Sequence, residues 1–446
     1  MQAADSANVQ DRFAGAVRTA LAKLHVLDCL RCAVVVVTLL CVLVTLEPFK
    51  NLTIIDDASG KLAATYICFA VLSAAGVLLS ASQNVPAFRT LWTPLHLSFL
   101  AWMALNILFS ENPAISLQRF ALTASVMSLA IMMPLLPSSL KSFNQCFAAG
   151  AIGLLLLCYL GVMLAPGVSI HNARDAAEPA LAGDWRGTFE HKNVASPVMA
   201  ILVYLGAYLI SAGAFLSGPT ILVLAAVFLF FTGGKTASLL CLIVWGMASV
   251  VGATKGLWQK CAICFVPLLL MNLLTVGSVV SPQLAKLTDA LPIDSTFTGR
   301  SEVWEFALGA VAEKPFAGHG YSAFWDGVRE KHTEQGAEWV ATVAHSHNSY
   351  LDLAVTIGLP GLLLVVLIFV WAPLKNFHAI QSRGARQPLA RFYLVVWLFG
   401  LYYATTETFL LDRINPTWFM FVVAVGGLHF LARFGVRSRT RVSGGA

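Results

Sequence analysis

The chain has 446 residues, of which 58% are hydrophobic and only 12% are charged, and its formal net charge is +6 at pH 7. An ordinary soluble domain has about 25% charged residues, so the composition excludes a water-soluble fold of this size, and the high apolar content excludes intrinsic disorder. The nine cysteines lie in or beside apolar runs, which argues against a disulfide scaffold. We therefore expect an integral membrane protein.

Apolar segments follow one another along most of the chain. A helix that crosses a bilayer needs roughly 20 apolar residues, so we expect an all-α polytopic membrane protein with about 12 transmembrane helices. The first nine occupy 30–280 and the last three occupy 349–433. The segments are 30–47, 62–82, 91–109, 117–137, 143–166, 194–214, 218–233, 236–253, 258–280, 349–373, 390–411 and 416–433.

The placement of lysine and arginine predicts the orientation. Cytoplasmic loops are enriched in these residues, and the 374–391 loop and the basic 434–446 tail contain several cations and no acid. Residues 1–29 are polar and of mixed charge, without a recognisable cleavage signal, so we expect them to form an N-terminal tail. Both tails are therefore predicted to be cytoplasmic.

Two long polar loops, 167–193 and 281–348, fall on the opposite, outer side in this topology. The second is long enough for a small helical subdomain on the membrane. Residues 301–311 repeat apolar positions with a helical period, for example at Val303, Phe306 and Ala310. A second amphipathic piece covers 321–334. We expect both to be helices that lie in the plane of the membrane interface.

Cations on the outer side have no positive-inside reason to be there. Arg186, Lys235 and Arg300 lie on this side, and together they suggest a bound anion with several charges. Polar residues beside the starts of the sixth and tenth spans complete the candidate binding set, which consists of His191, Lys192, Asn193, His345, His347, Asn348 and Tyr350.

Simpler explanations exist for these residues. An outer arginine is often a solvated surface charge, and a histidine at a helix start is often a cap. His345 and His347 have metal-ligand character, but no third ligand has diagnostic spacing, so no metal site is predicted. Glu407 lies inside the predicted eleventh span, where a carboxylate is costly, and it needs a partner or a water path in either a structural or a functional role.

Four motifs resemble one family. His347-Asn348, nine residues and Gly358-Leu-Pro-Gly361 resemble the H-[NSQ]-x9-G-x-x-[GTY] signature of the O-antigen ligase family, within the wider superfamily of ligases and O-antigen polymerases. The other three are an R-x-x-G-type loop ending in Asn, with its glycine displaced, a G-R-x-x-x-W stretch and a P-x-x-G-x-G turn. They occupy residues 186–193, 299–304 and 315–320. Lys235 departs from the family, which often has an arginine there.

The resemblance implies a GT-C-type glycosyltransferase architecture in the bacterial inner membrane, with a periplasmic active site. It implies en bloc transfer of a glycan from undecaprenyl diphosphate to a sugar hydroxyl of lipid A–core, completing lipopolysaccharide without a cofactor or a nucleic-acid partner. The family's two functional arginines correspond to Arg186 and Arg300, and its functional histidine corresponds to His347.

The residues suit this chemistry. A diphosphate leaving group needs fixed cations, and arginine binds phosphate oxygens with a planar fork. A sugar hydroxyl needs a base as it attacks, and histidine has a suitable pKa near 6.5. We therefore expect metal-independent transfer with inversion at the anomeric carbon. Gly358 and Pro360 are expected to break the tenth span and shape a cavity for the polyprenyl tail.

Other functions stay open from the sequence. An O-antigen polymerase or a protein O-glycosyltransferase uses the same donor, and these motifs separate the acceptors poorly. A transporter of an anionic lipid belongs to a different class. Transporters usually place charges near the bilayer midplane and contain internal repeats, whereas here the charges gather at one surface and no convincing repeat is found.

Overall fold

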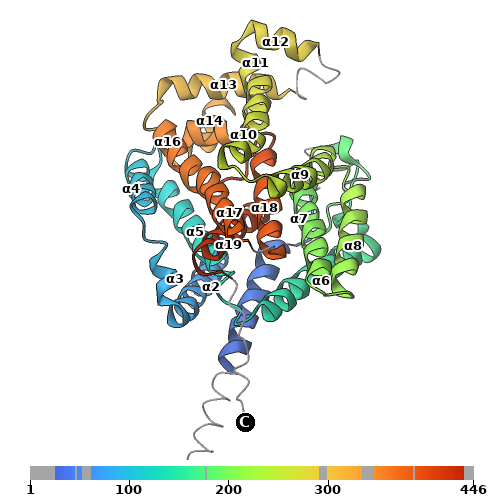
Figure 1. Ribbon diagram of the computed structural model, residues 1–446. Coiled ribbons are helices and arrows are strands. Elements are labelled where there is room, and N and C mark those ends of the chain that lie inside the picture. The colour runs from blue at the N-terminus through green and yellow to red at the C-terminus, as the bar shows by residue number, and fades with distance from the viewer. Residues whose placement is uncertain are drawn as a thin grey trace, which may run out of the picture.

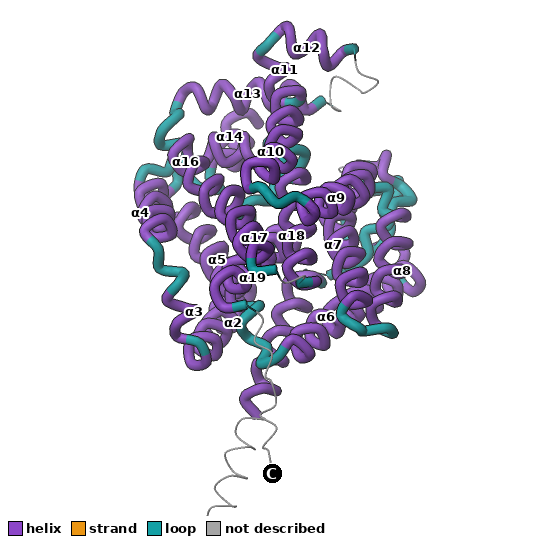
Figure 2. Tube along the Cα trace, viewed as in Figure 1, coloured by secondary structure: helices purple, strands orange, loops and turns teal. Residues whose placement is uncertain are grey.

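The computed structural model describes residues 26–45, 48–52, 62–175, 178–290, 299–333, 345–384 and 387–435. In these ranges the regular structure is helical, apart from an isolated bridge between Ile170 and Trp185. Figure 2 shows the helices joined mostly by short loops. The expected all-α class is confirmed. The predicted tails lie almost wholly outside the described residues.

Each predicted span contains an apolar helix, although the number that cross the membrane is not confirmed. In the described part of the chain, nine helices are long and apolar enough to cross a bilayer, and three apolar helices are shorter. The long ones are Val26–Leu43, α2 (Leu62–Gln83), α5 (Pro113–Met132), α6 (Leu140–Leu164), α7 (Lys192–Ser211), α9 (Lys235–Ala253), α10 (Leu257–Leu274), α16 (Ser349–Val365) continuing into α17 (Ala372–Ser382), and α19 (Pro416–Phe434). The short ones are α4 (Pro94–Leu108), α8 (Ser217–Phe231) and α18 (Pro388–Tyr403).

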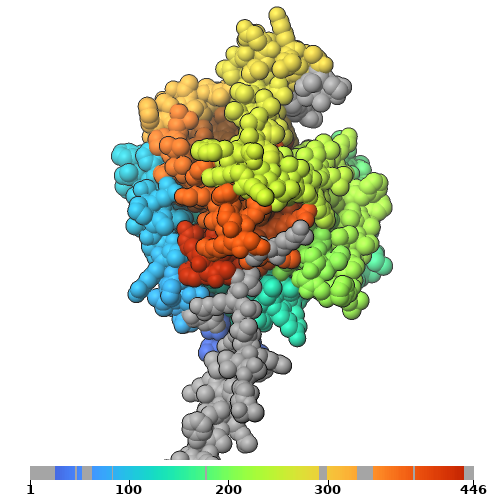
Figure 3. All heavy atoms as spheres, in the orientation of Figure 1, coloured from blue at the N-terminus to red at the C-terminus, as the bar shows by residue number. Residues whose placement is uncertain are grey.

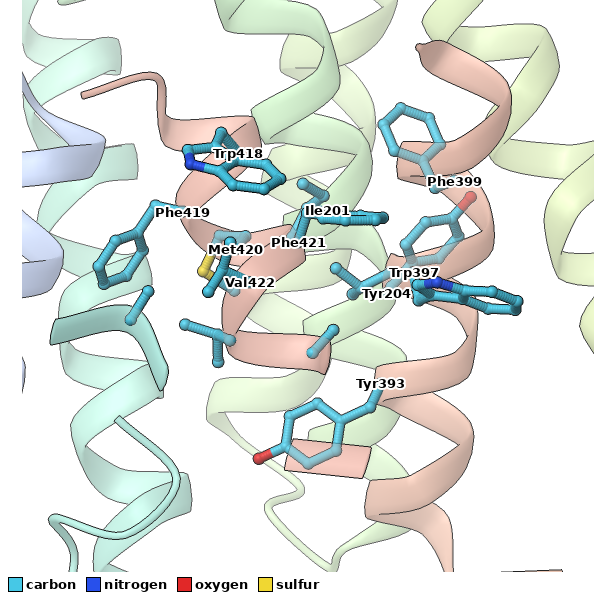
Figure 4. Packing of buried hydrophobic residues seen from close by; sticks show 14 of the residues in the cluster. Ile201, Tyr204, Tyr393, Trp397, Phe399, Trp418, Phe419, Met420, Phe421 and Val422 are labelled. Carbon is cyan, nitrogen blue, oxygen red and sulfur yellow. The ribbon is translucent and has the colours of Figure 1, made fainter. Parts of the chain in front are cut away.

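Most residues of α7, α18 and α19 are buried, and Figure 4 shows some of their side chains packed together, among them Tyr204, Trp397 and Phe421. In the most apolar stretch of each helix, 89% of the residues are buried in α19 and 78% in α7, whereas only 17% are buried in α2 and in α10. Lipid is as apolar as these side chains, so close packing rather than water exclusion favours this arrangement. Gly400 and Gly427 permit it, because a Cβ at either position would lie under 2.5 Å from the ring of Phe421 or Tyr393.

The tenth predicted span is broken at Gly358, as expected. Gly358 has φ 71°, and Pro360 follows it inside the helix. The turn 315–320 packs into the break. His319 N donates to Val355 O at 2.9 Å, Gly320 N donates to Thr356 O at 3.0 Å, and Leu359 N donates to Pro315 O at 2.8 Å. The turn therefore satisfies backbone groups that the broken helix leaves free.

The second polar loop contains the expected helices. They are α13 (Arg300–Glu313) and α14 (Phe324–Thr333), and the short helices α11 (Val276–Val280) and α12 (Pro282–Asp289) precede them. Val303, Trp304 and Ala307 of α13 are buried against α14 and the first turns of α16 in a small core of their own. These helices gather at one end of the bundle, and the start of the Val26–Leu43 helix lies at the other end (Figures 1 and 3).

Three predicted span ends differ from the structure by six residues or more. The tenth segment was expected to end at residue 373, but its helix continues through α17 to Ser382, so the first part of the predicted 374–391 loop is helical. The ninth segment was expected to continue to residue 280, but α10 ends at Leu274 and a separate helix, α11, follows. The eleventh was expected to continue to residue 411, but α18 ends at Tyr403. Glu407 therefore lies in the loop after α18 rather than inside a helix.

Candidate active site

The loop that follows α18 is the meeting point of several helix starts. At the start of α16, Ser349 N donates to Ala404 O at 2.8 Å and Ser349 Oγ donates to Glu407 O at 2.8 Å. At the start of α13, Arg300 Nη1 donates to Thr406 O. At the start of α7, Asn193 Nδ2 lies 3.3 Å from Glu407 Oε1. Because helix N-termini carry partial positive charge, this arrangement favours an anion nearby.

Glu407 is at the centre of a cluster of polar side chains. Its Oε1 accepts from Arg300 Nη2 at 2.8 Å, and its Oε2 lies 3.1 Å from His347 Nδ1. The Glu407 side chain is 15% exposed, whereas those of Arg300 and His347 are 25% and 31% exposed. The carboxylate is therefore enclosed, while the two partners that sequence analysis had selected face outward from it.

The surroundings of Glu407 keep it ionised. Burial alone would raise its pKa, but the hydrogen bond from His347 and the charges of Arg300, His347 and His345 lower the pKa to about 2. In the tautomer that carries its proton on Nδ1, His347 donates to ionised Glu407, and Nε2 is then the nitrogen that can accept a proton. This is the relation between carboxylate and imidazole that orients a general base.

The backbone around His347 is fixed. His347 has φ 52°, a left-handed conformation that is uncommon for a residue other than glycine. The next residue, Asn348, is fully buried and caps α16, because its Oδ1 accepts from the backbone nitrogens of Tyr350 and Leu351 at 3.0 Å each. The His345 ring stands edge-on to that of His347, with 4.2 Å between centroids.

Two predicted binding residues therefore have structural partners. Asn348 Nδ2 donates to Thr405 O at 3.2 Å and to Asn272 Oδ1 at 3.1 Å, and its side chain has no exposed surface. The Tyr350 hydroxyl donates to Leu401 O at 2.9 Å. Both tie the start of α16 to its neighbours. They position His347, and the geometry does not support a direct contact of either with a substrate.

Arg186 does not join the cluster. It is fully buried, and its Nη1 and Nη2 donate to Phe189 O at 3.0 Å and to Lys50 O at 2.8 Å. Its Nε has no acceptor in the described part of the chain. Burial lowers the pKa of the guanidinium, and Asp175 and Glu190 partly compensate. A phosphate has no exposed route to this guanidinium, so the geometry favours a role in holding two loops together.

The remaining candidates lie at the starts of α7 and α9. His191 caps α7 by accepting from Asn193 N at 3.0 Å, and its Nε2 lies 3.0 Å from Glu178 Oε2. Lys192 pairs with Asp184 at 2.6 Å. Lys235 is exposed at the first position of α9 and has no ion pair within the described ranges. Of these residues, Lys235 is the cation most available to a ligand.

The sequence marks Glu407 as a costly carboxylate in a predicted span but does not assign it to the site. The apolar residues after Tyr403, such as Phe409 and Leu410, extend the hydrophobic run and make the helix look longer than it is. The available signal was the polar stretch Thr405-Thr-Glu-Thr408, which is unusual inside a membrane helix.

The known proteins that this chain resembles are named for polysaccharide ligation or production. Residues 220–366 match the family described as O-antigen ligase. A protein of Rickettsia felis, provisionally named polysaccharide ligase, is 22% identical over 356 residues, which is 73% of this chain and 79% of that protein. The exopolysaccharide production protein ExoQ of Rhizobium meliloti is 34% identical over 82 residues, which is 18% of this chain and 19% of that protein.

Proposed function

We propose that this chain, which belongs to the O-antigen ligase family, transfers a glycan en bloc from undecaprenyl diphosphate to a sugar hydroxyl of lipid A–core at the periplasmic face of the bacterial inner membrane. The observation that carries the proposal is the Glu407 carboxylate, which contacts both His347 and Arg300. It joins the two chemical parts that such a transfer needs, a base for the acceptor and a cation for the leaving group.

His347 takes the proton. As the acceptor oxygen forms its bond to the anomeric carbon, the hydroxyl proton passes to Nε2 of His347, and Glu407 stabilises the imidazolium through Nδ1. Such a contribution from a positioned base is worth roughly 10²–10⁴-fold in rate. Attack from the face opposite the diphosphate inverts the anomeric carbon in one step.

Arg300 stabilises the leaving group. The bond between the anomeric carbon and the diphosphate oxygen breaks, and negative charge grows on that oxygen. Arg300 has five N–H donors, and two of its nitrogens are engaged by Thr406 and Glu407, so donors are left for phosphate. The starts of α7, α13 and α16 add partial positive charge, and we place exposed Lys235 on the donor's second phosphate.

Arg186 takes a different role from the one that the family resemblance implies. We assign it to loop positioning, because its Nη1 and Nη2 already donate to backbone carbonyls and the side chain has no exposed surface. Its loop leads into the first turn of α7, where Asn193 contacts Glu407, so Arg186 affects the site only through the position of that helix start.

The test is reconstitution of the purified chain in detergent micelles with an undecaprenyl diphosphate glycan and lipid A–core. Ligated lipopolysaccharide supports the proposal. A lengthened lipid-linked glycan would instead identify a polymerase, and transfer to a protein would identify a protein O-glycosyltransferase. No change in the glycan in micelles, combined with its movement across sealed vesicles, would identify a transporter.

A further inference from the structure

A cavity lies far from the candidate active site. It has a volume of about 640 Å³ and is bordered by α7, α9, α17 and α18, which are neighbours in Figure 1. Its lining comes from the C-terminal halves of α7 and α9 and from the N-terminal half of α18. Since α7 begins and α18 ends at the active site, this cavity opens at the opposite end of the bundle.

The cavity walls are apolar on one side and polar on the other. Tyr204, Trp245 and Phe392 present aromatic rings, and the Tyr204 and Trp245 rings meet edge-on at 5.8 Å between centroids. The polar side of the cavity is formed by Gln381, at the end of α17, and by Arg391, near the start of α18. A cavity with an apolar wall and a polar mouth fits a molecule that has an acyl chain and a headgroup.

Two amide oxygens in this lining have no partner. Gln381 Oε1 and Gln387 Oε1 are both buried and accept no hydrogen bond in the described structure. The Gln381 amide nitrogen donates to Gly252 O, which fixes the side chain at the cavity. Buried acceptors without partners are rare in folded proteins, and these two need donors such as hydroxyl groups.

The charge at the mouth is positive. Arg391 is exposed and donates to Ser249 Oγ at 2.7 Å, and it makes no ion pair with a described acid. Lys255 and Arg383 lie at the ends of α9 and α17 that face the same way. The distribution of lysine and arginine predicts that these loops are cytoplasmic, and the cytoplasmic leaflet carries anionic lipids.

We propose that this cavity binds a phospholipid with an anionic, hydroxyl-bearing headgroup. Arg391 contacts the phosphate, the headgroup hydroxyls donate to Gln381 and Gln387, and an acyl chain lies along Tyr204 and Trp245. The proposal is independent of the glycosyl transfer at the other end of the bundle, because it uses none of the residues of that site.

Native mass spectrometry of the full chain in detergent tests the proposal. The probes are phosphatidylglycerol, phosphatidic acid and phosphatidylcholine with identical acyl chains. We expect phosphatidylglycerol to be retained most strongly. Arg391→Gln should weaken its retention about tenfold or more, because a charge-assisted hydrogen bond is lost. Gly252→Phe should also weaken it, since no atom lies within 4 Å of a Cβ there and the ring enters the cavity.

The matched control is Arg89→Gln, which removes an exposed cation at the end of α3 (Val85–Arg89), a short helix that packs against α2. It should leave retention unchanged. Equal retention of phosphatidylglycerol and phosphatidylcholine by the wild-type chain would overturn the proposal. So would undiminished phosphatidylglycerol binding in a well-folded Arg391→Gln and in Gly252→Phe. Equal retention of phosphatidic acid would overturn recognition of the hydroxyl groups.

Discussion

Arg186 and Arg300 lie in two polar segments that the sequence predicts to be on the same outer side, and both are predicted to bind an anion. Their surroundings in the structure differ. Arg300 is 25% exposed and shares the carboxylate of Glu407 with His347. Arg186 has no exposed surface and binds the backbone carbonyls of Lys50 and Phe189. A cation on the outer side can therefore serve either a ligand or the fold. The hydrogen-bond partners distinguish the two roles. A buried guanidinium that is bound by backbone carbonyls cannot be approached by a phosphate.

The largest effect expected at the Arg300 end is the loss of the base. His347→Ala should lower turnover of the lipid-linked glycan by roughly 10²–10⁴-fold, while the purified protein keeps its elution profile and melting temperature. The measurement is the initial rate in micelles with saturating donor. Near-normal turnover in a folded variant would remove His347 from the chemistry, and His345 or His191 would become the candidate base.

Replacement of Glu407 tests whether it acts through His347. Glu407→Gln keeps the size of the side chain but removes the charge, so the imidazolium loses its stabilisation and the tautomer is no longer fixed. We expect kcat to fall by about 10²-fold or more, with little change in KM for the acceptor. A variant that loses thermal stability but keeps its kcat would assign Glu407 a purely structural role.

The stability of the cluster should depend on pH in a defined direction. The pKa of Glu407 is about 2 in the folded chain, below its ordinary value of 4.5. Ionised Glu407 therefore stabilises the fold fully above pH 4.5, and this contribution is lost as the pH falls toward 2. The melting temperature of the wild-type chain should fall more steeply over this interval than that of Glu407→Gln. Parallel curves would contradict the lowered pKa.

The sequence predicts the surroundings of Arg300 better than those of Arg186. It identified Arg300 and His347 because their motifs are local and lie at helix starts. It could not place Arg186 in the interior, because one acceptor is a carbonyl at Lys50, 136 positions earlier in the chain. It also could not end α18 at Tyr403, because apolar residues continue beyond the last turn and conceal the loop that carries Glu407.

Lysine replacements sharpen the comparison directly. Arg300→Lys keeps the charge but loses the planar fork, so we expect turnover to fall on the order of 10²–10³-fold with an unchanged melting temperature. Arg186→Lys should keep near-normal turnover per folded molecule. Equal loss of turnover in both variants, without loss of stability, would return Arg186 to the donor phosphates and break the distinction drawn here.

Arg186 should instead matter for stability. Hydrogen bonds to a charged group are worth about 1.5–3 kcal/mol each, and lysine cannot reach Phe189 O and Lys50 O together with one nitrogen. Arg186→Lys should therefore lower the free energy of unfolding by about 2 kcal/mol, measured as a lower melting temperature. The control is Arg174→Lys, which changes an exposed arginine of the same loop and should have no effect.

The smallest expected effect is that of metal removal, and it tests whether side chains alone supply the positive charge. The leaving diphosphate carries at least two negative charges, and the Arg300 end provides a guanidinium, the starts of three helices and exposed Lys235. Each helix start is equivalent to roughly half a positive charge, so these groups still leave a net charge of about +2.5 after the negative charge of ionised Glu407 is subtracted, which covers two charges on the diphosphate. Excess EDTA should then leave turnover unchanged.

Loss of turnover that Mg²⁺ or Mn²⁺ restores would contradict this charge balance. It would instead favour a bound cation at His345 and His347, whose rings already lie 4.2 Å apart. In that case Arg300→Lys should cost far less than 10²-fold, because the metal rather than the fork would stabilise the leaving oxygen.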